Sequence, residues 1–265
     1  MQNTKMKTVT ILLVWVILIL TCKSPSEEKP LSTQNPNTEL PSYNAVKIES
    51  AIIVDGKMDE PAWQDAMPAT FNYYYRDEKP SDKQKSTFRL MWDEQHLFLF
   101  YQFEDKYLTA REVNRDGEPY LDDCAEIFLI PVPEALDTHF CFEVNIYKAT
   151  NDILFFNDYY KGSNVGFKPF NPVVEIETTY LGTINDNSDI DTGWAMEMKI
   201  PISIFGFLAN FEPLKPGNSW RFLAIRQERN EVEGSRRTTS TIFEMPKNFN
   251  DVHVPSHFGV LNFVQ

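Results

Sequence analysis

The sequence predicts an all-β domain that folds as an antiparallel β-sandwich with a few short helices. Apolar and polar residues alternate along many short segments, and this is the period of a strand with one buried face. Asn, Asp, Gly and Pro separate the segments, as turns between strands require, while helical periodicity is scarce. Residues 42–265 have the size of one such domain, because all-β domains of about 200–250 residues are common.

Two hairpins are the clearest predicted elements. Residues 87–93 and 97–103 flank a polar turn, and residues 125–130 and 140–147 flank a proline-rich turn. The same alternation predicts further strands at residues 45–48, 52–54, 153–156, 173–180, 194–200, 220–225, 239–243 and 259–263.

Helical signals are confined to two places. Asp59 is a suitable cap for a short helix with Pro61 in its first turn, and Pro201 opens another that runs to Phe205. Three tryptophans fall on apolar strand faces and are expected to pack in the core: Trp92, Trp194 and Trp220.

The first residues are predicted to lie outside the fold. A basic start precedes an apolar run at residues 9–20, which is shorter than the ~20 residues that a membrane-spanning helix needs. This pattern is typical of a secretory signal. The ending at residues 19–22 resembles the lipobox of bacterial lipoproteins, in which the cysteine becomes the lipidated first residue. We expect residues 1–21 to be a lipoprotein signal peptide and Cys22 to carry lipid. The alternative is an ordinary signal peptide that is cut elsewhere.

Residues 23–41 are predicted to be a disordered tether. They contain four prolines, many polar residues and only two leucines, and such a composition cannot bury a core. Together with a lipid on Cys22, the tether would hold the domain at the cell envelope, outside the cytoplasm, on the outer membrane or the cell surface.

Charge and motifs exclude several function classes. The net charge is −13, and removal of residues 1–21, which contain two lysines and no acidic residue, makes it more negative. Nucleic-acid binding relies on basic patches, so it is not expected.

No nucleophile elbow, phosphate-binding loop, dinucleotide fingerprint or zinc spacing occurs, and no organic cofactor is expected. Pro255 breaks any helix between His253 and His257, so this segment is read as a turn before the last strand.

The cysteines of the domain are expected to be free thiols. In the second hairpin, Cys124 and Cys141 lie about four residues out of register, or roughly 13 Å apart at ~3.3 Å per residue. A disulfide needs Cα atoms closer than ~7 Å.

The stretch YLDDCAEIFLIP at residues 120–131 carries the most informative anomaly, because Glu126 interrupts an apolar, strand-forming run. If the proline-rich turn centres the hairpin, Glu126 lies opposite Glu143. Facing like charges destabilise a strand pair. We therefore expect a cation, a hydrogen-bonding ligand, a raised pKa or exposure to water to compensate.

A set of short motifs follows in a fixed order at residues 54–63 (VDGKMDEPAW), 92–93, 97–105, 123–129, 142–145, 193–197, 200–201, 220–222, 253–255 and 258–259. This ordered set resembles the family 9 carbohydrate-binding modules. It covers nearly all of the domain. It implies an immunoglobulin-like or DOMON-like β-sandwich that binds sugars, often at glycan chain ends, holds calcium and does not catalyse a reaction.

The resemblance also implies site residues. The family has two aromatic platforms and a glutamate six residues after the first. Tyr120 stands at the first platform position and Glu126 at the glutamate, while Phe243 is the aromatic residue nearest to the second platform. A family arginine falls at Glu143, and Arg226 is the candidate to replace it from a neighbouring strand.

Other polar and aromatic groups add candidates. Asp122 and Asp123 are expected calcium ligands because their oxygens are hard donors. The tyrosine tracts at residues 73–75 and 159–160 would either stack on sugars or cover loop backbone.

The function expected from these features is non-catalytic binding of a poly- or oligosaccharide at the cell envelope, in support of polysaccharide capture or breakdown. One alternative is a scaffold or partner-binding lipoprotein with a degenerate sugar site. A second is a glycoside hydrolase that pairs Glu126 with Glu143 or Asp123 at ~5–9 Å. A third is a haem domain, but the four histidines fall at turns or strand ends, which argues against axial ligation. The sequence identifies no protein partner.

Overall fold

The computed structural model describes residues 39–75, 84–156, 165–229, 232, 237–247 and 251–265. The predicted signal peptide, Cys22, nearly all of the tether and the 159–160 tyrosines therefore lie outside the described residues. Within the described ranges, no helix has the length and apolar character needed to cross a membrane.

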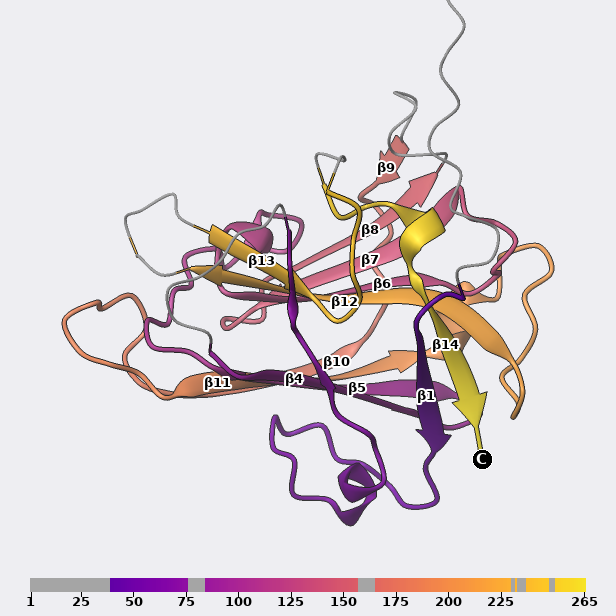
Figure 1. Ribbon diagram of the computed structural model, residues 1–265, viewed down its shortest axis with the longest axis horizontal. Coiled ribbons are helices and arrows are strands. Elements are labelled where there is room, and N and C mark those ends of the chain that lie inside the picture. Colours follow the sequence, from indigo (N-terminus) through magenta and orange to yellow (C-terminus); the bar gives the residue numbers. More distant parts are fainter. Residues whose placement is uncertain (1–38, 76–83, 157–164, 230–231, 233–236, 248–250) are drawn as a thin grey trace, which may run out of the picture. The chain divides into compact units, whose positions relative to one another are not determined.

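The domain is an all-β sandwich, as predicted. Figure 1 shows β4, β5, β10 and β11 in one layer and β6, β7, β8 and β12 in the other. The parallel pair β1 and β14 connects β4 to β12, so a single curled sheet forms both layers. The strands described are β1 Ser42–Lys47, β2 Ala69–Thr70, β3 Tyr73–Tyr74, β4 Ser86–Trp92, β5 His96–Glu104, β6 Cys124–Ile130, β7 Thr138–Asn145, β8 Thr150–Phe156, β9 Val165–Phe167, β10 Glu175–Leu181, β11 Gly193–Pro201, β12 Ser219–Arg229, β13 Arg237–Thr241 and β14 Gly259–Val264.

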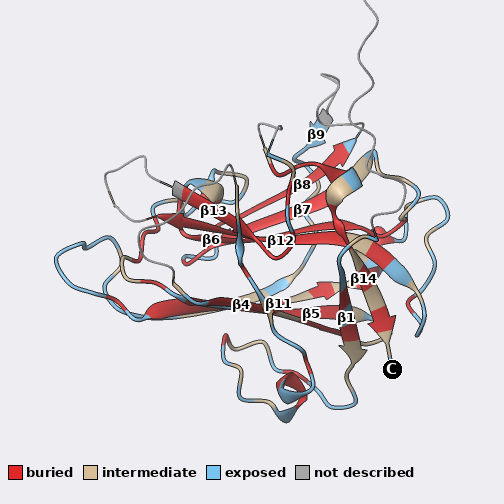
Figure 2. Ribbon diagram, in the orientation of Figure 1, coloured by how far each residue is buried: buried red, intermediate tan, exposed pale blue. Residues whose placement is uncertain are grey.

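The core lies between the two layers and is rich in aromatic rings. Figure 2 shows the central strands as mostly buried. Trp92, Trp194 and Trp220 all belong to this core, as predicted, and each is at most 3% exposed. Their edge-to-face and tilted contacts with phenylalanines, such as Trp220 with Phe205 at 5.1 Å, contribute beyond burial alone.

Both predicted hairpins are confirmed as β4–β5 and β6–β7, and the predicted register of the second is correct. Glu126 pairs with Glu143 across the two strands. Cys124 and Cys141 are buried free thiols, because Cys141 pairs with Phe128 rather than with Cys124.

The strand predicted at residues 52–54 is wrong. This segment forms no strand, and side chains accept the hydrogen bonds of Ile53 and of the two residues that follow Val54. Ile53 N donates to Glu60 Oε1, and the N–H groups of Asp55 and Gly56 both donate to Glu197 Oε2. The alternation of apolar and polar residues does not reveal whether a backbone N–H donates to a neighbouring strand or to a side chain, and the strand prediction failed for this reason.

The two predicted helices form as short 3₁₀ helices, Pro61–Gln64 and Ile202–Phe205. The predicted Asp59 cap is wrong, because Glu60 occupies the cap position and makes no side-chain cap bond. Two further 3₁₀ helices, Pro119–Leu121 and Pro255–His257, were not predicted, although the second is the expected turn before the last strand.

Glu197 of β11 binds the segment at residues 55–63 to the outer face of the layer formed by β4, β5, β10 and β11. Besides the two backbone donors at residues 55 and 56, it accepts a hydrogen bond from Trp63 Nε1 at 3.3 Å. Trp63 covers a small second core with Phe100 and Met91. Burial raises the pKa of Glu197 to about 7, against the opposing effect of these donors.

We expect Glu197→Ala to lower the free energy of unfolding by about 2–4 kcal/mol, because three N–H donors lose their acceptor at roughly 1 kcal/mol each. Chemical denaturation measures this loss. The matched control is Glu175→Ala on β10, whose exposed ion pair with Lys199 is expected to contribute under about 1 kcal/mol. Equal losses in the two variants would contradict the role given to Glu197.

Candidate functional site

A cleft of about 330 Å³ lies on the outer face of the layer formed by β12, β6, β7 and β8. Its volume falls in the range of small-molecule sites, about 300–1,000 Å³. The yellow segment between β13 and β14 passes over this side in Figure 1. The residues that line the cleft are Tyr75, Tyr120, Glu126, Glu143, Asn151, Ile153, Phe155, Lys168, Gln227, Thr239, Asp251, Val252 and His253.

The register of the strands places a polar row across the floor of the cleft. Glu126 pairs with Glu143, and Glu143 pairs with Asn151 on β8. Alternation along β6 turns Glu126 to the cleft while Ala125 and Ile127 face the core. Glu126 is 2% and Glu143 is 6% exposed, so exposure to water does not compensate for the facing carboxylates.

Hydrogen bonds and a raised pKa compensate at Glu143. Asn151 Nδ2 donates to Glu143 Oε2 at 2.6 Å, and the Cys141 thiol donates to Oε1 at 3.4 Å. Burial raises the pKa of Glu143 to about 7, and the two donors only partly oppose that effect. A carboxyl that is neutral over part of the neutral pH range reduces the repulsion across the pair.

This raised pKa predicts a pH-dependent stability. Between pH 4.5 and about 7 the unfolded chain has lost the Glu143 proton while the folded protein keeps it, so the free energy of unfolding falls as pH rises and then levels off. The total is up to about 3 kcal/mol, at 1.36 kcal/mol per pKa unit. We expect Glu143→Gln to gain stability relative to the wild type between pH 4.5 and pH 8. Denaturant titrations of both proteins at the two pH values measure this change, and an unchanged difference would contradict it.

Aromatic side chains form walls of the cleft. Tyr120 comes from the 3₁₀ helix Pro119–Leu121, and its hydroxyl donates to Glu118 Oε1 at 2.7 Å. Tyr75 follows β3 and is the one residue of the 73–75 tract that lines the cleft. Phe155 of β8 and His253 complete the ring-bearing residues. The cleft thus combines stacking faces with carboxylate acceptors.

Arg226 lies outside this cleft. On β12 it pairs with Ala125, which faces the core, so its side chain points between the layers. It is 1% exposed, donates to Asp105 Oδ2 at 2.9 Å and lies 4.9 Å from the centre of the Phe103 ring. The β12 side chain that reaches the cleft is the next one, Gln227.

Phe243 also lies outside the cleft. Its ring packs edge-to-face on Phe222 at 5.3 Å and is buried. Gly259 permits this packing, because a Cβ at residue 259 would lie 2.1 Å from the Phe243 ring. In the described residues, Tyr75 is the better candidate for a second platform.

Asp122 and Asp123 anchor the loop that follows β5. Asp122 Oδ2 accepts the backbone N–H groups of Arg111 and Glu112, and Asp123 accepts those of Thr109 and Arg229. A cation at either carboxylate would have to displace these donors, so the two residues do not fit a calcium site as they are arranged. In the described ranges, no group of three or more His, Cys, Asp or Glu is placed to hold a metal.

Several cleft residues were not identified from the sequence: Asn151, Ile153, Phe155, Lys168, Gln227, Thr239, Asp251 and Val252. Two of these residues could have been identified from the sequence. Asn151 and Gln227 are polar residues inside apolar strands, and their parity puts them on the face of Glu143 and Glu126.

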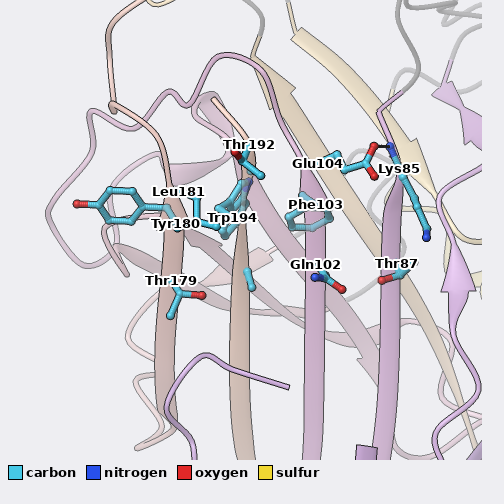
Figure 3. A pocket seen from close by; sticks show the side chains of 12 residues that line it. Lys85, Thr87, Gln102, Phe103, Glu104, Thr179, Tyr180, Leu181, Thr192 and Trp194 are labelled. Atoms are coloured by element: carbon cyan, nitrogen blue, oxygen red, sulfur yellow. Dashed lines mark hydrogen bonds between the residues drawn. The ribbon is translucent and has the colours of Figure 1, made fainter. Parts of the chain in front are cut away.

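A second groove, of about 360 Å³, lies on the other layer (Figure 3). Its floor includes a cross-strand row of Thr87, Gln102, Ala195 and Thr179. The rings of Phe103 and Trp194 are buried, and in Figure 3 Tyr180 points away from Gln102. Tyr180 is the exposed ring among the lining residues of this groove. Because it points away from the polar row at the floor, we favour the first cleft as the ligand site.

Comparison with known proteins identifies the family. A family model described as carbohydrate family 9 binding domain-like matches residues 54–265. The chain belongs to this family. No curated protein matches the sequence significantly.

Solved structures confirm the family 9 fold. A putative carbohydrate-binding protein from Bacteroides uniformis ATCC 8492 matches with a TM-score of 0.63 and 16% identity, over 84% of this chain and 99% of its own. A family 9 module from Caldicellulosiruptor kristjanssonii in complex with glucose matches with a TM-score of 0.58 and 18% identity, over 84% of this chain and 95% of its own. The same module with cellotriose matches equally well over 93% of its length.

Proposed function

We propose that this family 9 domain binds a poly- or oligosaccharide in the cleft of Tyr120, Glu126 and Glu143, without chemical conversion of the sugar. The single observation that carries the proposal is that three residues expected at the family's sugar site, from two strands and a 3₁₀ helix, line one cleft. Related modules solved with glucose and cellotriose support the ligand class.

The chemistry of the cleft suits a sugar. Carboxylate and amide groups exchange hydrogen bonds with hydroxyls, and buried polar groups discriminate strongly against ligands that leave them unpaired. Tyr120 and Tyr75 offer ring faces for the apolar side of a pyranose. Glu126, Glu143 and Asn151 lie in one row at the floor, so a ring stacked on a wall can present its hydroxyls to them.

A glycoside hydrolase is the second candidate, and one observation favours it. Glu143 has a raised pKa and faces a second carboxyl group, that of Glu126, and glycosidases use a pair of carboxyl groups of which the acid has a raised pKa. Asp123 is excluded as the partner, since backbone donors occupy its carboxylate. Release of reducing sugar from a bound oligosaccharide would establish this function, and intact oligosaccharide after long incubation would reject it.

The cellular role is part of the proposal. A lipid on Cys22 and a tether to residue 41 would hold the domain at the cell envelope, where it captures polysaccharide for breakdown. Membrane fractionation of the wild type and of Cys22→Ala tests the anchor: the variant is expected in the soluble fraction. Calcium, if bound, would use ligands other than the carboxylates of Asp122 and Asp123.

Binding of the protein to a broad glycan array, with and without a chelator, tests the proposed function. We expect selective binding to one class of glycan. Loss of binding with the chelator would assign calcium a role. A folded protein that binds no glycan would reject sugar binding and favour the scaffold or partner-binding role.

A further inference from the structure

Two buried histidines meet beside the cleft. His139 is the second residue of β7 and is fully buried, whereas His253 precedes the last 3₁₀ helix and lines the cleft. His139 Nε2 lies 3.0 Å from His253 Nδ1. This distance is that of a hydrogen bond, so one of the two nitrogens carries a proton and the other accepts it.

Aromatic packing fixes both imidazoles. His253 stacks on Phe128 with ring centres 4.3 Å apart, and His139 stacks on Phe155 at 4.8 Å. Phe258 also packs its edge against His139 at 5.9 Å. Stacking fixes the plane of each ring, and the contact between His139 Nε2 and His253 Nδ1 selects the orientation within that plane, because turning either ring over would put a carbon atom in place of a nitrogen.

The surroundings of His139 decide which nitrogen carries the proton. Its Nδ1 is buried and has no hydrogen-bond partner in the part of the chain that the structure describes. An unpaired buried N–H is among the rarest groups in folded proteins. The proton of His139 therefore belongs on Nε2, where it has an acceptor. Burial lowers the pKa of both imidazoles, which keeps the pair neutral.

It follows that His253 Nδ1 is the acceptor, and that His253 holds its own proton on Nε2. The Nδ1 side of the His253 ring faces His139, which does not line the cleft, so the opposite edge is the part that reaches it. We propose that His253 is a ligand-binding residue that presents an Nε2–H donor to the cleft, and that His139 is a positioning residue that fixes this tautomer. The inference rests on the proposed function and deepens it.

The donor complements the acceptors of the cleft. The carboxyl groups of Glu126 and Glu143 supply acceptor oxygens to the cleft, whereas a sugar hydroxyl both donates and accepts. A hydroxyl that donates to a floor carboxylate still has an oxygen lone pair, which a neutral imidazole N–H can satisfy. The ligand class is therefore a glycan with a hydroxyl or ring oxygen placed between the floor and the His253 wall.

Nitrogen-15 NMR of the ligand-free protein tests the tautomers directly. Single replacements of each of the four histidines assign the signals. We expect both His139 and His253 to carry the proton on Nε2 and to stay neutral at pH 7. A proton on His253 Nδ1, or a charged ring, would overturn the inference, whether or not the protein binds sugar.

Titration with cellotriose, the trisaccharide in a related structure, tests the ligand role. We expect His253→Phe to weaken binding about tenfold, as loss of one hydrogen bond predicts. His139→Phe, which keeps the ring packing, should weaken it by a factor of about three to ten and mix the His253 tautomers. His139→Gln, whose amide can donate to His253, should recover binding. His96→Phe on β5 is the matched control and should bind normally.

Unchanged affinity in His253→Phe would overturn the ligand role. Weak binding in His139→Phe without a tautomer change would show that His139 only supports the fold and would overturn its positioning role. A wild type that binds no cellotriose would count against the proposed function for this sugar and against the ligand role of His253, while the NMR result would still decide the His139–His253 assignment.

Discussion

Replacement of Arg226 by alanine is expected to lower the free energy of unfolding by about 3–5 kcal/mol, the largest stability effect that the structure predicts. The Arg226 guanidinium donates to Asp105, to Ser86 and to the backbone oxygen of Glu104. Arg226 Nη1 also lies 4.0 Å from Glu228 Oε2. Removal of this cation leaves buried carboxylates without the charge that balances them.

The pKa values describe the same balance. Burial raises the pKa of Asp105 to about 6 even with Arg226 beside it, and burial raises the pKa of Asp123 well above its usual value. Without the guanidinium both acids would bind protons more readily, so the Arg226→Ala variant should lose most stability at high pH. Addition of Asp105→Asn should recover part of the loss.

Chemical denaturation at pH 8 measures the effect, with Lys199→Ala as the control for an exposed ion pair. A loss below about 1 kcal/mol in Arg226→Ala would show that the buried pair does not stabilise the domain. At temperatures where the variant is folded, its glycan affinity should equal that of the wild type, since Arg226 does not line the cleft.

Glu126→Gln is expected to weaken glycan binding by about 10–100-fold, the largest functional effect. A hydrogen bond to a charged group contributes about 1.5–3 kcal/mol, and each 1.4 kcal/mol is a factor of ten in affinity. Glutamine keeps the size of the side chain but replaces one acceptor oxygen with a donor. Calorimetric titration of the two proteins with the best glycan of the array measures the ratio.

The matched control is Glu104→Gln, an exposed acid that lines the second groove. Its affinity should stay within about twofold of the wild type, because Glu104 is exposed, accepts the backbone N–H of Lys85 and does not line the cleft. If Glu104→Gln lost binding and Glu126→Gln did not, the ligand site would lie on the β4–β5 layer.

The hairpin that carries the site could be predicted from the sequence because its register depends on local features. The proline-rich turn fixes which residues of β6 and β7 face each other, and the period of two then puts Glu126 and Glu143 on one face. The family's spacing of six residues between the first aromatic platform and the glutamate also identified Tyr120 as a candidate site residue. These three residues come from a stretch of about 25 positions, over which turn length and alternation suffice.

The candidate residues that lie outside the cleft depend on longer-range packing. Arg226 differs from the cleft-facing Gln227 by one position, and only the pairing of β12 with β6 decides which of the two faces inwards. Asp122 and Asp123 bond to the loop after β5, whose path the sequence does not reveal. Tyr75 and His253 reach the cleft from segments remote in the chain, so no local pattern could place them together.

The central claim is that a glycan binds in the cleft on the β6–β7 layer. The most direct test is to map, by NMR of the protein, which residues the glycan contacts. Backbone amide shifts would be followed during titration with the best glycan of the array. The account predicts the largest shifts around Glu126, Glu143, Asn151 and His253. Shifts confined to the groove of Thr87, Gln102 and Thr179 would contradict it.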